Sequence, residues 1–361
     1  MRRSGVPADL VALPKAELHL HLEGALRRAT AAELADRYRL PLPRTGRFAG
    51  LPDFVVAYEQ ARDLIGTLDD LRRVAAELLT TARENGVVWT EVHLIPATYG
   101  GRLGPDEAVV EAVLDGLASA ASPAAAGGLI IGVNRMLPLP AAERGLALAL
   151  RYRDAGVVGL GMAADEARFP ASLFADVFRR AGDAGLPVVP HAGEGAGAES
   201  VRACVEQLGA VRINHGVRAV EDPEVVQLLR DRGVSLDVCP SSNAALGVVP
   251  SLSEHPLPAL LRARVPVTLN TDCPLFLATS TVREYALARD VLGLPDEALV
   301  GIAATSLRTS SCPAERREAA LARLAAWRAP STQPVGRGAQ GLAGFLVELT
   351  DQFGGGPRGR E

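Results

Sequence analysis

The chain has 361 residues, of which 48% are hydrophobic, enough for two average domains or for one large barrel with a sizeable core. Its formal net charge is −4 and its pI is about 6.0, so no basic field indicates nucleic acid as a partner. No apolar stretch is long and uncharged enough to cross a bilayer, and the N-terminus lacks an apolar core with a cleavage site, so we expect neither a membrane span nor a signal peptide.

The spacing of the cysteines indicates whether the protein folds in a reducing or an oxidising cellular compartment. The four cysteines are widely spaced and form no CxxC pair, which is typical of reduced thiols rather than of a disulfide framework. We therefore expect a cytoplasmic protein. The cysteines are Cys204, Cys239, Cys273 and Cys312.

Short apolar runs rich in branched residues alternate along the chain with longer helical patterns. Near-continuous apolar strands, each followed by a helix, are typical of a parallel sheet covered on both faces, and eight such units favour a closed α/β fold, the (β/α)₈ or TIM-type barrel. An open doubly wound sheet is the alternative, but "HLHLEGAL" stands where its glycine-rich phosphate turn belongs. The expected strands are residues 16–23, 87–97, 128–136, 156–163, 186–194, 211–216, 234–240 and 265–272.

Two segments exceed what a plain barrel needs. Residues 27–86 are long for one connection and contain helical patterns such as 53–66, so we expect extra helices after strand 1 that cover the site. Helical patterns also continue through 280–328. We expect one barrel domain over 1–330, followed by a Pro/Gly-rich tail, 331–361, that is partly mobile and contains one possible short helix, "LAGFLVELTDQF".

Reactive residues gather at the expected carboxyl ends of strands, which converge on one face of a barrel. His19 and His21 are two apart on the first strand, so their side chains point to the same side. His191 ends the fifth strand and Asp272 ends the eighth. Three imidazole nitrogens and one carboxylate oxygen suit Zn²⁺ and leave room for a water molecule, whose pKa zinc lowers to about 7.

Each of these motifs also has an ordinary structural interpretation when it is taken alone. HxH occurs often by chance, "HAGE" is commonly a strand-end turn, and a single histidine such as His215 in "INHG" is commonly a hydrogen-bonded structural residue. Their joint placement at four strand ends favours a single metal-dependent site. His255, in "SEHPLP", falls in a loop and receives no role.

These stretches, in this order, resemble the adenosine deaminase family of zinc aminohydrolases, in the metal-dependent amidohydrolase superfamily. The resemblance covers residues from about 14 to 285, and it implies a barrel hydrolase that deaminates a small molecule. The matching stretches are "PKAELHLHLEGAL" (14–26), "HAGE" (191–194), "RINHG" (212–216), "DVCPSSN" (237–243) and "VPVTLNTDCP" (265–274).

The resemblance also implies roles for individual residues. Glu194 donates a proton to the purine ring nitrogen beside the reacting carbon, and His215 orients the attacking water and stabilises the developing charge. Asp272 takes a proton from that water. Glu23, where many members have Asp, lies with His21 beside the sugar hydroxyls. One zinc ion per chain is bound by His19, His21, His191 and Asp272.

The chain departs from the family pattern where the purine ring is recognised. Cys273 replaces a second Asp that hydrogen-bonds the imidazole ring of the purine, and a thiol is a weak donor and acceptor. Ala164, in "GLGMAADEA", replaces a Gly whose backbone N–H meets another purine nitrogen. Asn214 stands where Gly is usual, and His93 stands where Arg is usual.

The sequence therefore predicts a zinc-dependent deaminase of an aminopurine nucleoside or a related amino-heterocycle. Because the groups that read the purine have changed, we expect adenosine to be a poor substrate. Aminodeoxyfutalosine, a modified purine and a non-purine amino-heterocycle are the candidates. Two alternatives stay open: a zinc hydrolase acting on a different C–N bond, and a non-catalytic binding or regulatory member of the family.

Overall fold

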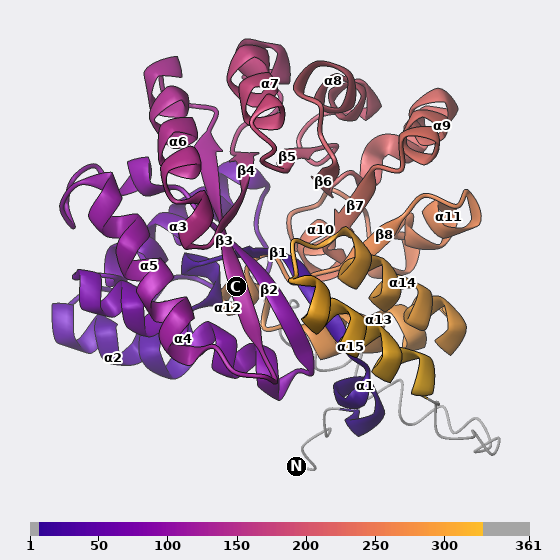
Figure 1. Cartoon of the computed structure of the whole chain (residues 1–361), viewed down its shortest axis with the longest axis horizontal. Helices are drawn as coiled ribbons and strands as arrows, with labels where there is room; N and C mark the ends of the chain where they lie inside the picture. The colour runs from indigo at the N-terminus through magenta and orange to yellow at the C-terminus, as the bar shows by residue number, and fades with distance from the viewer. Residues whose placement is uncertain (1–6, 328–361) are drawn as a thin grey trace, which may run out of the picture.

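The computed structural model describes residues 7–327, whose eight strands form one parallel sheet in which each strand pairs with the next along the chain. The strands stand at the centre and the helices surround them (Figure 1). The predicted (β/α)₈ barrel is confirmed. The predicted tail, 331–361, lies outside the described residues, and the domain boundary at 330 stays a prediction.

The strands are buried on both faces, as a sheet inside a ring of helices requires. Every residue of the first two strands is buried. The strands are β1 (Lys15–His21), β2 (Val87–Leu94), β3 (Ala126–Asn134), β4 (Val157–Ala163), β5 (Val188–Ala192), β6 (Arg212–His215), β7 (Ser235–Val238) and β8 (Val267–Leu269).

The barrel closes between β1 and β8 through a short contact. One parallel bridge joins Leu20 to Asp272, and the Asp272 N–H donates to the carbonyl oxygen of His19 over 3.0 Å. The side chain of Asn270 accepts the Leu18 N–H over 2.7 Å, so an amide oxygen replaces a main-chain acceptor there. The observed strand, β8, is shorter at both ends than the predicted 265–272, and on its β1 side the Asn270 side chain makes a hydrogen bond that the main chain would otherwise make.

The helices form the outer ring and the extra segments. Among residues 7–327, no helix is both long and apolar enough to cross a membrane. The helices before β4 are α1 (Ala8–Ala12), η1 (Glu23–Ala25), α2 (Arg28–Tyr38), α3 (Leu51–Leu64), α4 (Leu68–Glu84), η2 (Pro96–Tyr99), α5 (Asp106–Ala120), α6 (Leu139–Arg151) and η3 (Arg153–Ala155). Those after it are η4 (Ala171–Phe174), α7 (Ala175–Asp183), α8 (Ala198–Leu208), η5 (Val217–Glu221), α9 (Pro223–Arg232), α10 (Pro240–Ala245), η6 (Leu252–Glu254), α11 (Leu257–Arg262), α12 (Pro274–Leu277), α13 (Thr281–Asp290), α14 (Asp296–Thr309) and α15 (Ala314–Ala326).

The predicted insertion after strand 1 consists of α2, α3 and α4. Thr67 caps α4, accepting the N–H of Asp70 while the Asp70 carboxylate accepts the N–H of Thr67, the reciprocal pair that satisfies two free amides. Phe54 and Tyr58 of α3 lie against Phe276 of α12, with ring centroids 5.2 and 6.2 Å away. The insertion thereby packs on the segment that follows β8, at the carboxyl ends of the strands.

A buried ionic group lies inside the barrel beneath these ends. The Arg212 guanidinium of β6 donates to Asp237 of β7, with 3.0 Å between Nε and Oδ2, and also to Glu91 of β2. All three side chains are almost fully buried, so each charge depends on its partners. The group joins three strands and fixes the backbone of β7, whose Asp237 carbonyl oxygen faces the site described next.

Candidate active site

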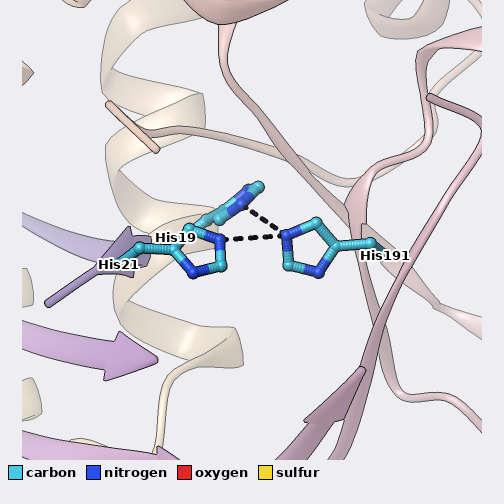
Figure 2. A group of neighbouring side chains, drawn as sticks. All are labelled: His19, His21 and His191. Carbon is cyan, nitrogen blue, oxygen red and sulfur yellow. Dashed lines mark hydrogen bonds between the residues drawn. The ribbon is translucent and has the colours of Figure 1, made fainter. Parts of the chain in front are cut away.

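Three histidines from opposite sides of the barrel meet at the carboxyl ends of the strands. The Nε2 atom of His191, from β5, lies 3.1 Å from the Nε2 atoms of both His19 and His21, from β1 (Figure 2). The Oδ1 atom of Asp272 lies 3.5 and 3.4 Å from the same atoms of His19 and His21. The structure thus brings together the four residues that the sequence singled out as ligands.

The chemistry of this group fits a metal ion. Burial lowers the pKa of His19 and of His191 well below the ordinary value, and the neutral imidazole is the form that binds metals. The Nδ1 atom of His19 lies 3.1 Å from the carbonyl oxygen of Asp237, so Nδ1–H donates outward and Nε2 keeps its lone pair. A carboxylate completes a set of three nitrogens and one oxygen.

Asp272 is oriented by its neighbours. Its Oδ2 atom accepts a hydrogen bond from the Ser242 hydroxyl of α10 over 2.7 Å, and the Cys273 thiol lies 3.4 Å from Oδ1. Burial raises the pKa of Cys273 well above the ordinary value, so it remains a neutral thiol. Oδ1, which faces the histidines, is left with only a weak second partner.

Asn214 contacts the His191 ring and also the His93 ring, and the sequence assigned no role to Asn214 or to His93. The Nδ2 atom of Asn214, in β6, lies 3.1 Å from His191 Nδ1 and 3.3 Å from His93 Nε2. His93 comes from β2 and is buried, with its ring centroid 5.3 Å from that of His21. Both residues were visible only as departures from the family pattern.

Glu194 and His215 face each other beside the histidine group. The distance from Glu194 Oε1 to His215 Nε2 is 3.5 Å. Burial raises the pKa of the Glu194 carboxyl, which favours the protonated form of an acid. Its side chain is 12% exposed, whereas that of His215 is 1% exposed, so Glu194 is the more accessible of the two.

A buried carboxylate holds the loop that carries Glu194. Glu166 accepts four successive backbone N–H groups, from residues 193–196, at 2.7 to 3.1 Å. Such a set satisfies a carboxylate and fixes the loop after β5. Glu166 had no expected role, although an acidic residue two positions after Ala164, just beyond strand 4, was visible in the sequence.

Three site residues adopt a left-handed backbone that glycine normally takes. The φ angles are 84° for Ala164, 63° for His215 and 60° for Asp272, at the ends of different strands. Such angles in residues with a Cβ cost of order 1–3 kcal/mol each and occur mostly at functional sites. At Ala164 the angle explains why the family pattern has glycine at this position.

The remaining side of the site is built around Glu23. Tyr58 donates to its Oε2 atom over 2.5 Å, and Tyr99 donates to its Oε1 atom over 2.9 Å. Cys273 packs close by, because a Cβ atom added to Gly24 would lie only 2.6 Å from its sulfur. Both carboxylate oxygens of Glu23 are therefore already hydrogen-bonded within the protein.

The chain is similar to known deaminases over most of its length. The sequence model of the family described as "Adenosine deaminase" matches residues 14–327. An adenine deaminase of Mesorhizobium japonicum and an adenosine deaminase of Erwinia tasmaniensis are each 35% identical, covering 86% and 87% of this chain and 98% of each relative. An aminodeoxyfutalosine deaminase of Acidothermus cellulolyticus is also 35% identical, over 78% of this chain and 84% of the relative.

Solved structures show the same architecture. The crystal structure of an adenine deaminase from Arthrobacter aurescens superposes with a TM-score of 0.81 at 30% identity, covering 87% of this chain and 98% of that one. An amidohydrolase from Burkholderia ambifaria with bound Zn has a TM-score of 0.78 at 25% identity, covering 97% of each chain. The chain belongs to the adenosine deaminase family.

Proposed function

We propose that this protein is a zinc-dependent hydrolytic deaminase that removes an exocyclic amino group from a purine ring as ammonia. The observation that carries the proposal is the convergence of His19, His21, His191 and Asp272 beside the carboxyl of Glu194. Deaminases that act on adenine, adenosine and aminodeoxyfutalosine are among its relatives, which supports an aminopurine substrate. A cytoplasmic location stays a prediction.

The histidines and Asp272 would hold one zinc ion, which supplies a Lewis acid that activates a water molecule at neutral pH. Asp272 accepts a proton from the attacking water. Glu194 donates a proton to the ring nitrogen beside the carbon under attack, where negative charge develops. His215 donates a hydrogen bond that orients the water. The amino group then takes up the proton that Asp272 accepted and leaves as ammonia, and the remaining proton of the attacking water restores the Glu194 acid.

The groups that meet the rest of the substrate form a second part of the proposal. The backbone N–H of Ala164 and the thiol of Cys273 face the ring, and His21 and Glu23 lie toward its substituent. Since Tyr58 and Tyr99 already donate to Glu23, their hydroxyl groups belong to the same surface. A thiol in place of a carboxyl weakens recognition of a ring nitrogen that needs a strong partner.

A panel of amino-heterocycles tests the proposal. Adenine, adenosine, aminodeoxyfutalosine, modified aminopurines and amino-pyrimidines are each incubated with the zinc-loaded protein, and ammonia release is measured. Glu194→Gln is the matched control, since it keeps the shape of the side chain and removes its transferable proton. Release from at least one aminopurine that depends on Glu194 supports the proposal. Activity confined to another C–N bond, or binding without turnover, would favour one of the two alternatives instead.

A further inference from the structure

A chain of hydrogen bonds runs from the backbone of α11 to His215. The Leu257 N–H donates to His255 Nδ1 over 3.1 Å, and His255 Nε2 lies 3.1 Å from Asn243 Oδ1. The Nδ2 atom of Asn243 lies 3.1 Å from His215 Nδ1. His255, Asn243 and His215 are each at most 3% exposed, so these groups depend on one another for partners.

The first member of this chain sets the direction of every bond. A backbone N–H can only donate, so His255 Nδ1 is an acceptor and carries no proton. Burial lowers the pKa of His255 to about 4, so the ring is neutral and its single proton is on Nε2. That proton requires an oxygen opposite, and the Asn243 amide must present Oδ1 to His255 and its NH₂ group to His215.

The orientation of the Asn243 amide determines which nitrogen of His215 carries a proton. Its Nδ1 atom accepts from the Asn243 amide and so carries no proton, which leaves the ring proton on Nε2, the atom that faces Glu194 Oε1 at 3.5 Å. We infer that Asn243 and His255 are positioning residues that hold His215 with its proton on Nε2. His215 therefore presents a hydrogen-bond donor to the reacting atoms, and its lone pair points away from them.

The backbone at His215 and at α10 bears on where these side chains are placed. His215 has a left-handed φ of 63° at the end of β6. Asn243 lies one residue after Ser242, which donates to Asp272, so the short helix α10 orients two site residues at once. The inference rests on the proposed function of His215, whereas the hydrogen-bond direction can be tested without any substrate.

The direct test is the protonation of the imidazole nitrogens in the zinc-loaded full chain. Nitrogen-15 NMR of labelled histidine distinguishes a nitrogen that carries a proton from one that accepts, and His215→Gln assigns the signals. We expect His215 Nδ1 to be unprotonated and Nε2 to carry the proton. A protonated Nδ1 would overturn the inference, whether or not the protein proves to be a deaminase.

Asn243→Asp tests the consequence for catalysis. The new carboxylate accepts from both rings, so it should move the His215 proton to Nδ1 and leave Nε2 without one. We expect kcat to fall about 100-fold, within the usual contribution of a positioned proton donor, with KM and zinc content close to wild type. A kcat equal to wild type would show that the proton position does not matter.

His255→Phe tests the first link separately. This variant keeps a ring in the buried space but leaves Asn243 Oδ1 without a donor, so the amide can turn over. We expect a smaller fall in kcat, about 10-fold, and a His215 signal that reports both tautomers. An unchanged kcat and an unchanged His215 signal would show that His255 does not set the direction of the amide.

Discussion

His93 and Asn214 are in contact, with 3.3 Å between His93 Nε2 and Asn214 Nδ2, although they come from β2 and β6. Both are departures from the family pattern, and Asn214 also lies 3.1 Å from Nδ1 of His191. A metal at Nε2 leaves the proton of His191 on Nδ1, which then needs an acceptor. If the Asn214 amide is rotated by 180°, its oxygen takes the place of Nδ2 and can accept from both rings. That oxygen has no other partner among the described residues.

We predict that Asn214→Ala weakens metal binding. Removing the group that orients a metal-bound histidine usually costs about 10–100-fold in affinity, so we expect a loss of that order. The measurement is a competition for zinc with a chelator of known affinity. His93→Gln is the matched control, because it leaves the contact between Asn214 and His191 in place. Equal zinc affinity in Asn214→Ala and wild type would remove Asn214 from the metal site.

The four proposed ligand residues should be required for metal binding. We expect the purified protein to contain about one zinc ion per chain, because three nitrogens and one carboxylate converge at one point. His19→Ala and Asp272→Ala should each lose most of it, as metal analysis of the purified variants would show. Stoichiometric zinc in both variants would mean that the metal lies elsewhere.

The sequence was informative where local pattern determines structure. The apolar runs placed all eight strands because a buried parallel strand needs apolar side chains on both faces. The spacing of His19 and His21 placed both imidazoles on one side because side chains alternate along a strand. Position at a strand's carboxyl end was sufficient to group these residues with His191 and Asp272.

Contacts between distant segments could not be predicted in this way. His255 lies in a loop, and only the packing of that loop on α10 brings it to Asn243. Glu166 accepts hydrogen bonds from a loop 27 to 30 residues further along the chain, and a hydrophobic pattern in the sequence cannot predict such a contact. His93 and Asn214 are in contact although they are 121 residues apart in the sequence. Such pairs arise from tertiary structure, so one sequence shows their residues but not their contacts.

Glu194 should be required for turnover and not for metal binding. It follows His191 by three residues, its carboxyl faces His215, and burial raises its pKa, as suits a proton donor. We expect Glu194→Gln to lower kcat by roughly 10²–10⁴-fold while zinc content stays at the wild-type level. Steady-state kinetics beside metal analysis provides the test. Near-normal turnover at full zinc occupancy would exclude Glu194 as the acid.

Cys273 should determine which ring is accepted. Its thiol is buried next to Asp272 and Gly24, so it offers a ring nitrogen only a weak partner. A buried polar group left without a good partner costs about 1–3 kcal/mol. That cost corresponds to roughly a 5- to 150-fold penalty in kcat/KM, at about 1.4 kcal/mol per factor of ten. We therefore expect the wild-type protein to deaminate adenosine poorly.

Cys273→Asp should raise activity on adenosine and lower it on the native substrate. A carboxyl introduced beside Asp272 is disfavoured as a second anion, so it would be held protonated and could donate to a ring nitrogen. The close approach of Gly24, together with the methyl group of Ala164, limits the gain.

Cys273→Ser is the matched control, since it keeps the size of the side chain and adds no carboxyl. The deciding quantity is the ratio of kcat/KM for adenosine between Cys273→Asp and wild type at full zinc occupancy. If the wild-type protein deaminated adenosine efficiently and Cys273→Asp left kcat/KM unchanged, the thiol would have no effect on substrate choice, and other residues would determine specificity.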